Sequence, residues 1–102
     1  MNGVHEIAQY RVRPGTDPVR LQAILKSLHA WLTAQPGCLE IRSFLAEDGI
    51  GVTDLIAWRS KGEAQKAMAA SEHQECLQAL LPLVEPDSFG VNYGRQLLET
   101  RP

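Results

Sequence analysis

The segment from Asp54 to Gln74 constrains the fold of this chain more than any other stretch of its sequence. It reads as a strand that ends on Trp58, a turn of two residues, and then a helix rich in small side chains. Ser60 and Glu63 have the spacing of a capping box, which marks the start of that helix. The segment therefore predicts a junction where a sheet and a helix meet beside a tryptophan.

The rest of the chain supplies the other elements of a small α+β domain. Side-chain alternation predicts strands over residues 4–12, 38–47, 52–58 and 89–98. Asp17 and Pro18 suit the cap and first position of a helix over residues 18–34, and a bent helical segment follows residue 60. The order β-α-β-β-α-β is that of a ferredoxin-like fold, with a four-stranded antiparallel sheet and both helices on one face. A length of 102 residues fits a single domain over residues 1–102.

One face of such a sheet is left open and needs a cover. In a small protein a second copy of the chain can supply it by packing sheet against sheet. We therefore expect a homodimer formed through the open sheet face.

Charge and composition exclude several classes of protein. The net charge is −2 and Lys and Arg are scattered, which argues against binding to nucleic acid. No apolar run approaches the roughly 18 residues that a membrane span needs, and residues 1–6 lack the pattern of a signal peptide. Cys38 and Cys76 lack metal or redox spacing, so we expect a reduced, cytoplasmic protein without a bound metal.

Three motifs resemble a known family. Arg13-Pro14-Gly15 follows the first strand, Gln35-Pro36-Gly37-Cys38-Leu39 begins the second, and Ile56-Ala57-Trp58-Arg59-Ser60-Lys61-Gly62-Glu63-Ala64 leads into the second helix. Over roughly residues 4–98 the chain resembles the antibiotic biosynthesis monooxygenase (ABM) domain of the dimeric α+β barrel superfamily. The resemblance implies a homodimer. It also implies, as in some members, oxygenation of quinols or polyketide-like phenols without a cofactor.

Another branch of the same superfamily degrades haem, and many members have no known activity. The positions here that match the haem-binding residues of that branch are about Ala8, Ala67 and Leu77, and none of them can bind iron or press on a porphyrin. The resemblance therefore favours the cofactor-independent oxygenases over the haem-degrading enzymes.

A cofactor-independent oxygenase needs a group that takes a proton from a phenol, hydrogen-bond donors, and an apolar pocket. His73, at the predicted helix bend, is the candidate acid/base, although a solvent-facing position is an alternative. Tyr10 and Tyr93, on the first and last strands, are candidate donors to a substrate oxygen, or cap the edge of the core. Arg42 is a candidate partner of an oxyanion.

Four further residues are candidates for substrate binding. Trp58 would be a pocket wall or, alternatively, a core residue that joins helix to sheet. Met68 lies on the predicted inner stripe of the second helix. His5 and Gln9 share one face of the first strand, where they would line a cavity or a dimer interface.

Two interpretations of function follow. The first is a cofactor-independent monooxygenase of the ABM type that acts on a small aromatic or quinol-like substrate. The second is a ligand-binding or structural homodimer of the same fold without catalysis, favoured by the small residues of the second helix, which leave less room for a substrate. An isomerase or decarboxylase on this fold stays open.

Overall fold

The first helix begins where its capping residues predict. The computed structural model describes residues 3–102. The Asp17 carboxylate accepts a hydrogen bond from the Val19 backbone N–H, and Pro18 fills the first position of helix α1 (Pro18–Thr33). The buried stripe of α1 consists of Leu21, Leu25, Leu28 and Leu32.

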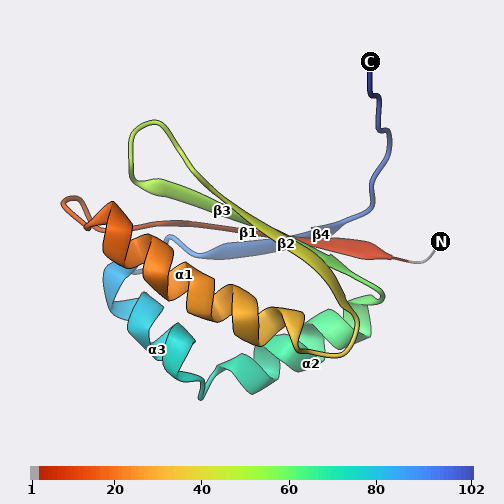
Figure 1. Cartoon of the computed structure of the whole chain (residues 1–102), viewed down its shortest axis with the longest axis horizontal. Helices are drawn as coiled ribbons and strands as arrows, with labels where there is room; N and C mark the ends of the chain where they lie inside the picture. Colours follow the sequence, from red (N-terminus) through yellow and green to blue (C-terminus); the bar gives the residue numbers. More distant parts are fainter. Residues whose placement is uncertain (1–2) are drawn as a thin grey trace.

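Four strands form one sheet beneath which the helices lie. They are β1 (Val4–Arg11), β2 (Cys38–Leu45), β3 (Gly51–Trp58) and β4 (Gly90–Gly94), in the order β2-β3-β1-β4 with every neighbouring pair antiparallel. Helix α2 (Lys61–Ser71), helix α3 (Glu75–Leu80) and a short 3-10 turn, η1 (Leu81–Leu83), complete the layer that α1 begins. All helices cover the same face of the sheet (Figure 1). The predicted ferredoxin-like α+β fold is confirmed.

The core lies between the sheet and these helices. Alternation along β1 and β3 directs one side chain in two toward the helices, and this set is buried throughout. It comprises Val4, Glu6, Ala8 and Tyr10 of β1 with Val52, Asp54, Ile56 and Trp58 of β3. Two of the eight are acidic, and they lie at the centre of the candidate site.

The junction between β3 and α2 is held by its capping residues. The Ser60 hydroxyl accepts a hydrogen bond from the Glu63 backbone N–H at 3.2 Å. Arg59 forms an ion pair with Glu63, and its backbone N–H donates to the Gly37 carbonyl at 2.7 Å. Gly37 has a positive φ of 85°, and a Cβ there would lie 2.4 Å from the Glu63 carboxyl carbon. The turn before β2 is thus fitted tightly against the start of α2.

Strand β4 is shorter than predicted. The sequence predicts a strand over residues 89–98, but pairing with β1 stops at Gly94, opposite His5. Strand β1 begins at Val4, so only one residue of β1 remains beyond His5 for β4 to pair with. The chain beyond Gly94 leaves the sheet and extends away from the body of the molecule (Figure 1).

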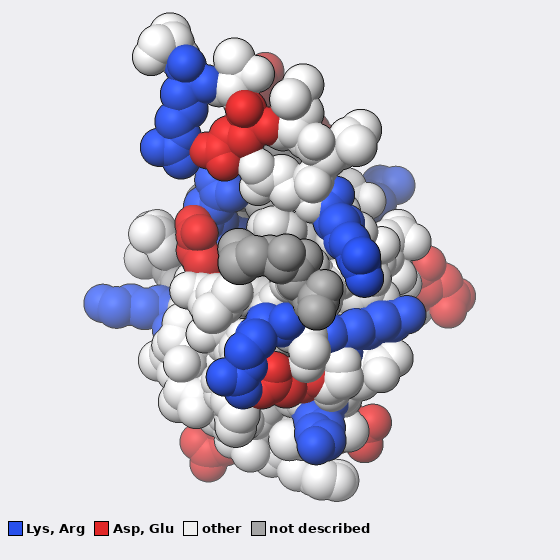
Figure 2. Space-filling model, turned by 90° about the vertical axis from the view of Figure 1, so that its right-hand side faces the viewer, with Lys and Arg blue, Asp and Glu red and all other residues white. Residues whose placement is uncertain are grey.

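The face of the sheet opposite the helices carries no layer of its own in residues 3–102 (Figure 1). No helix within residues 3–102 is long and apolar enough to cross a membrane. At the end of the molecule near the C-terminal tail, Lys and Arg side chains are interspersed with Asp and Glu (Figure 2). Met1 and Asn2 lie outside the described residues. They belong to the domain predicted over residues 1–102 and to the segment without a signal-peptide pattern.

Candidate functional site

A cavity of about 200 Å³ lies between the helix-facing side of the sheet and the helices. Strands β1 and β3 provide its floor, and α1, α2 and α3 provide its walls. The walls and floor are mostly apolar, with Ala8, Leu28, Leu32, Ile56, Ala67 and Leu80 among the lining residues. The polar groups of the floor are Glu6, Tyr10, Asp54 and Trp58.

Glu6 and Trp58 form a buried hydrogen-bonded pair in this floor. The Trp58 indole Nε1–H donates to Glu6 Oε1 at 3.0 Å, and both side chains are buried. Burial raises the pKa of Glu6, although the Trp58 hydrogen bond opposes that rise and the nearby Asp54 adds to it. Trp58 therefore anchors the core and lines the cavity at once.

Asp54 is the second buried acid, and it ends a chain of hydrogen bonds. The Ser43 hydroxyl donates to Asp54 Oδ1 at 2.5 Å, and His29 Nε2 lies 2.7 Å from the same hydroxyl oxygen. Burial raises the pKa of Asp54, and the Ser43 hydrogen bond partly opposes that rise. A carboxylate that is poorly solvated in this way is a stronger base than one in water.

Tyr10 lies beside Asp54 in the cavity floor. Its hydroxyl is the one buried side-chain polar atom of residues 3–102 that lacks a hydrogen-bond partner. Burial, the neighbouring Asp54 charge and the interaction of the hydroxyl with the Asp54 carboxylate raise the pKa of Tyr10, so it stays a neutral phenol that can donate to Asp54 or to a ligand oxygen. A buried donor without a partner costs free energy, and a ligand oxygen would satisfy it.

The cavity opens on one side of the molecule. Four of its lining residues are exposed. They are Met68 of α2, Glu72 just after α2, Leu81 of η1, and Phe89 just before β4. The Phe89 ring stacks on Tyr10, with ring centroids 5.9 Å apart. These four side chains therefore surround the opening, while Tyr10 and the two acids are buried behind it.

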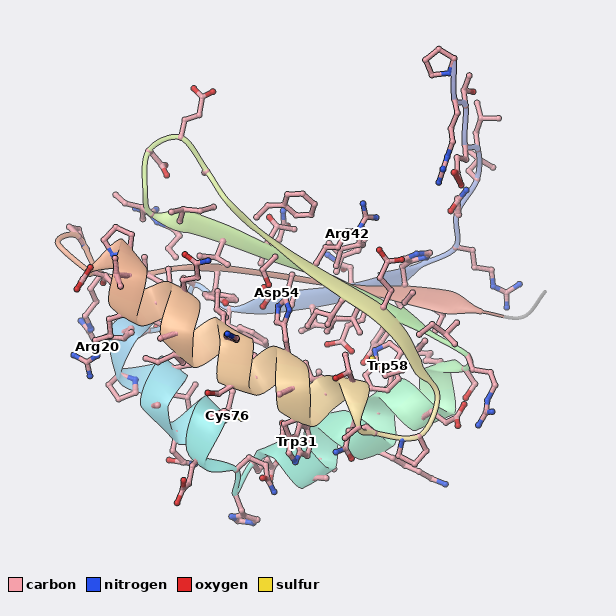
Figure 3. All side chains as sticks on the ribbon, in the orientation of Figure 1. Arg20, Trp31, Arg42, Asp54, Trp58 and Cys76 are labelled. Carbon is pink, nitrogen blue, oxygen red and sulfur yellow. The ribbon has the colours of Figure 1, made fainter. Side chains whose placement is uncertain are left out.

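Three of the residues predicted from the sequence line this cavity, and Tyr10 is one of them. Trp58 lies in the floor, and Met68 lies at the opening with 38% of its surface exposed. Asp54 and Trp58 extend to the helix side of the sheet, whereas Arg42 projects from the opposite side (Figure 3).

The other predicted residues lie elsewhere. Arg42, His5 and Gln9 occupy the open face, where Arg42 pairs with Glu40. These three residues are brought to the predicted dimer face rather than to the cavity.

His73 and Tyr93 are also outside the cavity lining. His73 is exposed in the turn between α2 and α3 and borders a separate depression that includes Trp31 and Cys76. Tyr93 is half-buried on β4, opposite Glu6, with the Lys61 ammonium 5.0 Å from its ring centre. The structure therefore does not bring the predicted acid/base, donor and oxyanion partner together.

Besides Tyr10 and Trp58, the structure brings together residues that were not predicted from the sequence, although a signal for them is present. Glu6, Asp54 and Ser43 occupy the helix-facing parity of their strands, where the neighbouring positions are apolar. A polar residue at such a position is either paired or functional. His29 of α1 is only partly exposed and reaches Ser43.

No group of three or more His, Cys, Asp or Glu side chains within residues 3–102 is arranged to hold a metal ion.

Comparison with solved structures identifies the class of fold. The chain superimposes on SnoaB of Streptomyces nogalater, a cofactor-independent oxygenase, with a TM-score of 0.80, 14% identity and 97% of each chain covered. It superimposes on the "putative antibiotic biosynthesis monooxygenase" of Bordetella bronchiseptica with a TM-score of 0.83, 15% identity, and 96% and 100% of the two chains covered.

A third match is a monooxygenase of Streptomyces coelicolor solved in complex with nanaomycin D. It has a TM-score of 0.73, 17% identity, and 99% of this chain and 93% of that chain covered. No family model and no curated protein matches the sequence. The predicted resemblance to the ABM proteins is thus confirmed at the level of the fold.

Proposed function

We propose that this protein is a cofactor-independent monooxygenase of the ABM type that oxidises a small phenol or hydroquinone. The observation that carries the proposal is the buried Asp54 carboxylate beside the unpartnered Tyr10 hydroxyl, in an apolar cavity. The fold shared with the cofactor-independent oxygenase SnoaB supports it.

The size of the cavity selects the class of substrate. An apolar cavity of about 150 Å³ accommodates benzene. A cavity of about 200 Å³ therefore fits a single aromatic ring with small polar substituents. Leu28, Leu32 and Ile56 would contact the ring, and Tyr10 and Asp54 would contact its hydroxyl.

The residues divide the chemistry between them. Asp54 takes the phenolic proton, and the Tyr10 hydroxyl donates a hydrogen bond to the phenolate oxygen that forms. The electron-rich phenolate transfers an electron to dioxygen, and a carbon–oxygen bond forms at a ring carbon that carries hydrogen. This carbon is para to the phenolate oxygen in a simple phenol and ortho to it in a hydroquinone, whose para carbon already carries oxygen. Protonated Asp54 returns one proton to the peroxide anion that results, and the hydroperoxide then loses water and leaves a quinone. The substrate supplies all four electrons, so one oxygen atom enters the product and the other leaves as water.

Oxygen uptake with a panel of one-ring phenols and hydroquinones tests this proposal. The wild type is expected to consume one dioxygen per quinone formed, and Asp54→Asn to lower the rate about 10²–10⁴-fold because it keeps the shape and removes the base. Asp48→Asn, in an exposed turn, is the matched control. Equal rates for Asp54→Asn and the wild type would exclude Asp54 as the base, and no uptake with any phenol would exclude the oxygenase.

A ligand-binding homodimer without catalysis is the second candidate. Ala64 and Ala67 of α2 are buried, which brings that helix close to the sheet and keeps the cavity small. Saturable binding of a one-ring phenol, measured by quenching of Trp58 fluorescence without oxygen uptake, would favour this function over the oxygenase.

We also propose that two copies pack through the open face of the sheet. The half-buried Ile7 and Leu55 lie on that face and the exposed Phe44 borders it, so an apolar patch is left in water. Size-exclusion chromatography with light scattering should give a dimer, and Phe44→Glu should give a monomer. Val19→Glu, at an apolar position that is 75% exposed on α1, should leave the dimer intact. A wild-type monomer at micromolar concentration would contradict the proposal.

A further inference from the structure

The hydrogen-bonded chain behind Asp54 leads out of the cavity by a route that the substrate does not use. It passes from Asp54 of β3 to Ser43 of β2 and on to His29 of α1, with steps of 2.5 Å and 2.7 Å. His29 and Ser43 both border a surface depression of about 460 Å³ between α1 and β2, together with Lys26. Asp54 lines only the inner cavity, whereas Ser43 and His29 line only this outer depression.

The two openings lie at opposite edges of the sheet. Strand β2 is one edge strand, and β4, which Phe89 immediately precedes, is the other. The cavity opens near Phe89, and the outer depression opens along β2. A bound phenol would block the first opening and leave the second in contact with water.

We propose that Ser43 and His29 exchange the proton of Asp54 with the solvent at the β2 edge, carrying the phenolic proton out and returning one proton to Asp54 when the peroxide forms. This inference rests on the proposed function, since it concerns the fate of the phenolic proton. Ser43 and His29 act through Asp54 and touch no substrate, so they are positioning residues rather than catalytic ones.

The proton count balances at each step. Protonated Asp54 donates to Ser43 Oγ while the Ser43 hydroxyl donates to Nε2 of a neutral imidazole. One proton then moves from Asp54 to Ser43 and another from Ser43 to His29, which leaves a carboxylate and an imidazolium. The imidazolium releases its Nδ1 proton to water, and Nε2–H then donates to Ser43, whose hydroxyl donates to Asp54. The same steps in reverse return one proton to Asp54 when the peroxide forms, so the overall oxidation releases no net proton. No oxidant, reductant or metal takes part.

Other ionisable groups face Asp54 and must be separated from the relay. Tyr10 and Glu6 of β1 share the cavity floor with it, and Glu72, just after α2, lies among the residues at the opening. None of the three belongs to the hydrogen-bonded chain that reaches His29. Their titration would reach Asp54 through space and would persist when Ser43 is removed.

Nuclear magnetic resonance tests the relay without any turnover. With ¹³C in the Asp54 carboxyl and ¹⁵N in the histidine rings, we expect the His29 Nε2 resonance to shift in step with the titration of Asp54. In Ser43→Ala the shared step should vanish while Asp54 still titrates, and in Ser43→Thr, which keeps the hydroxyl, it should remain. The exposed His73 serves as the internal reference in each spectrum. A His29 resonance that ignores Asp54 in the wild type would overturn the proposal even if the protein consumes oxygen.

Kinetics give the second test. His29→Gln keeps a hydrogen-bonding group near Ser43 but cannot carry a proton, and we expect turnover to fall about 10–100-fold, less than on loss of the base itself. In His29→Ala, imidazole added to the solvent should restore turnover, because the lost ring bordered an open depression. Ser27→Ala, on the exposed side of α1, is the control. Full activity in His29→Gln, or a loss in His29→Ala that imidazole does not restore, would overturn the relay. If no phenol is oxidised, the spectra still decide it.

Discussion

The Trp58 indole donates a 3.0 Å hydrogen bond to the Glu6 carboxylate across the two central strands, in the interior of the protein. Trp58 belongs to the motif that resembles the ABM family. Glu6 lies on the helix-facing side of β1, where the neighbouring positions are apolar. The pair therefore links the stability of the fold to the electrostatics of the cavity.

Removing the indole N–H should expose that link. Trp58→Phe leaves the buried Glu6 oxygen without its donor, and an unsatisfied buried group of this kind costs about 1–3 kcal/mol of unfolding free energy. The deficit, measured by urea unfolding, should shrink at pH 5, where Glu6 is more often protonated. Trp31→Phe, at a partly exposed position of α1, should show a small loss without pH dependence. An equal, pH-independent loss in both variants would mean that ring volume alone sets the effect.

The two buried acids should make the protein less stable as the pH rises through their folded pKa values. Burial raises the pKa of Glu6 above its ordinary 4.5 and that of Asp54 above its ordinary 3.8. Between the unfolded and folded values the folded state holds more protons, so the unfolding free energy falls with increasing pH. Asp54→Asn and Glu6→Gln should each flatten this decline in urea titrations from pH 4 to pH 8.

The exposed Asp48 should change the unfolding free energy with pH in the opposite direction, which provides a comparison. Backbone N–H groups of Ile50 and Gly51 hold the pKa of Asp48 below its ordinary value, so its contribution is present above that value and lost as the pH falls. Asp48→Asn should therefore change the acid side of the curve only. A decline with rising pH that survives in Asp54→Asn and Glu6→Gln alike would contradict the assignment of the buried pair.

Shortening Met68 should widen the range of substrates. Its side chain lines the opening of the cavity and is 38% exposed, so Met68→Ala should cost less than the 2–5 kcal/mol typical of a buried site, about 1 kcal/mol. The kcat/KM for two-ring phenols should rise relative to that for one-ring phenols. Met68→Leu, which keeps most of the volume, should leave the ratio unchanged. An unchanged ratio in Met68→Ala would show that the limit on size lies deeper in the cavity.

Two glycines with the same backbone conformation separate strain from collision. Gly37 and Gly15 have φ values of 85° and 84°, but a Cβ at Gly37 would meet the Glu63 carboxyl, whereas one at Gly15 would meet nothing within 4 Å. Gly15→Ala should cost about 1–2 kcal/mol from backbone conformation alone. Gly37→Ala should cost more, because it also displaces Glu63 from Arg59. Equal losses of unfolding free energy would show that Glu63 moves aside freely.

The order of elements could be predicted because each carries a local signal. Asp17 and Pro18 mark the start of α1, and Ser60 and Glu63 mark the start of α2. Alternation placed His5 and Gln9 on one face of β1, as the structure has them. The length of β4 could not be predicted, because it depends on where its partner β1 begins, which is a property of the pairing and not of residues 89–98.

The site was harder to predict because its groups come from distant segments. His73 has the right chemistry at a helix bend, but the bend turns it toward solvent. The sequence places Asp54 in a strand, and only the register that sets it beside Ser43 and Tyr10 shows that it is buried. An acid on the apolar parity of a strand is the signal that would have located it.

The small volume left between α2 and the sheet, which follows from Ala64 and Ala67, has a consequence for how the protein handles water. A one-ring ligand would occupy nearly all of the free space, so bulk solvent could not share the chamber with a reactive peroxide. Proton transfer through Ser43 and His29 would then proceed while bulk water is excluded from the cavity. Protons and organic molecules would then exchange with the solvent by separate routes and at different stages of the reaction.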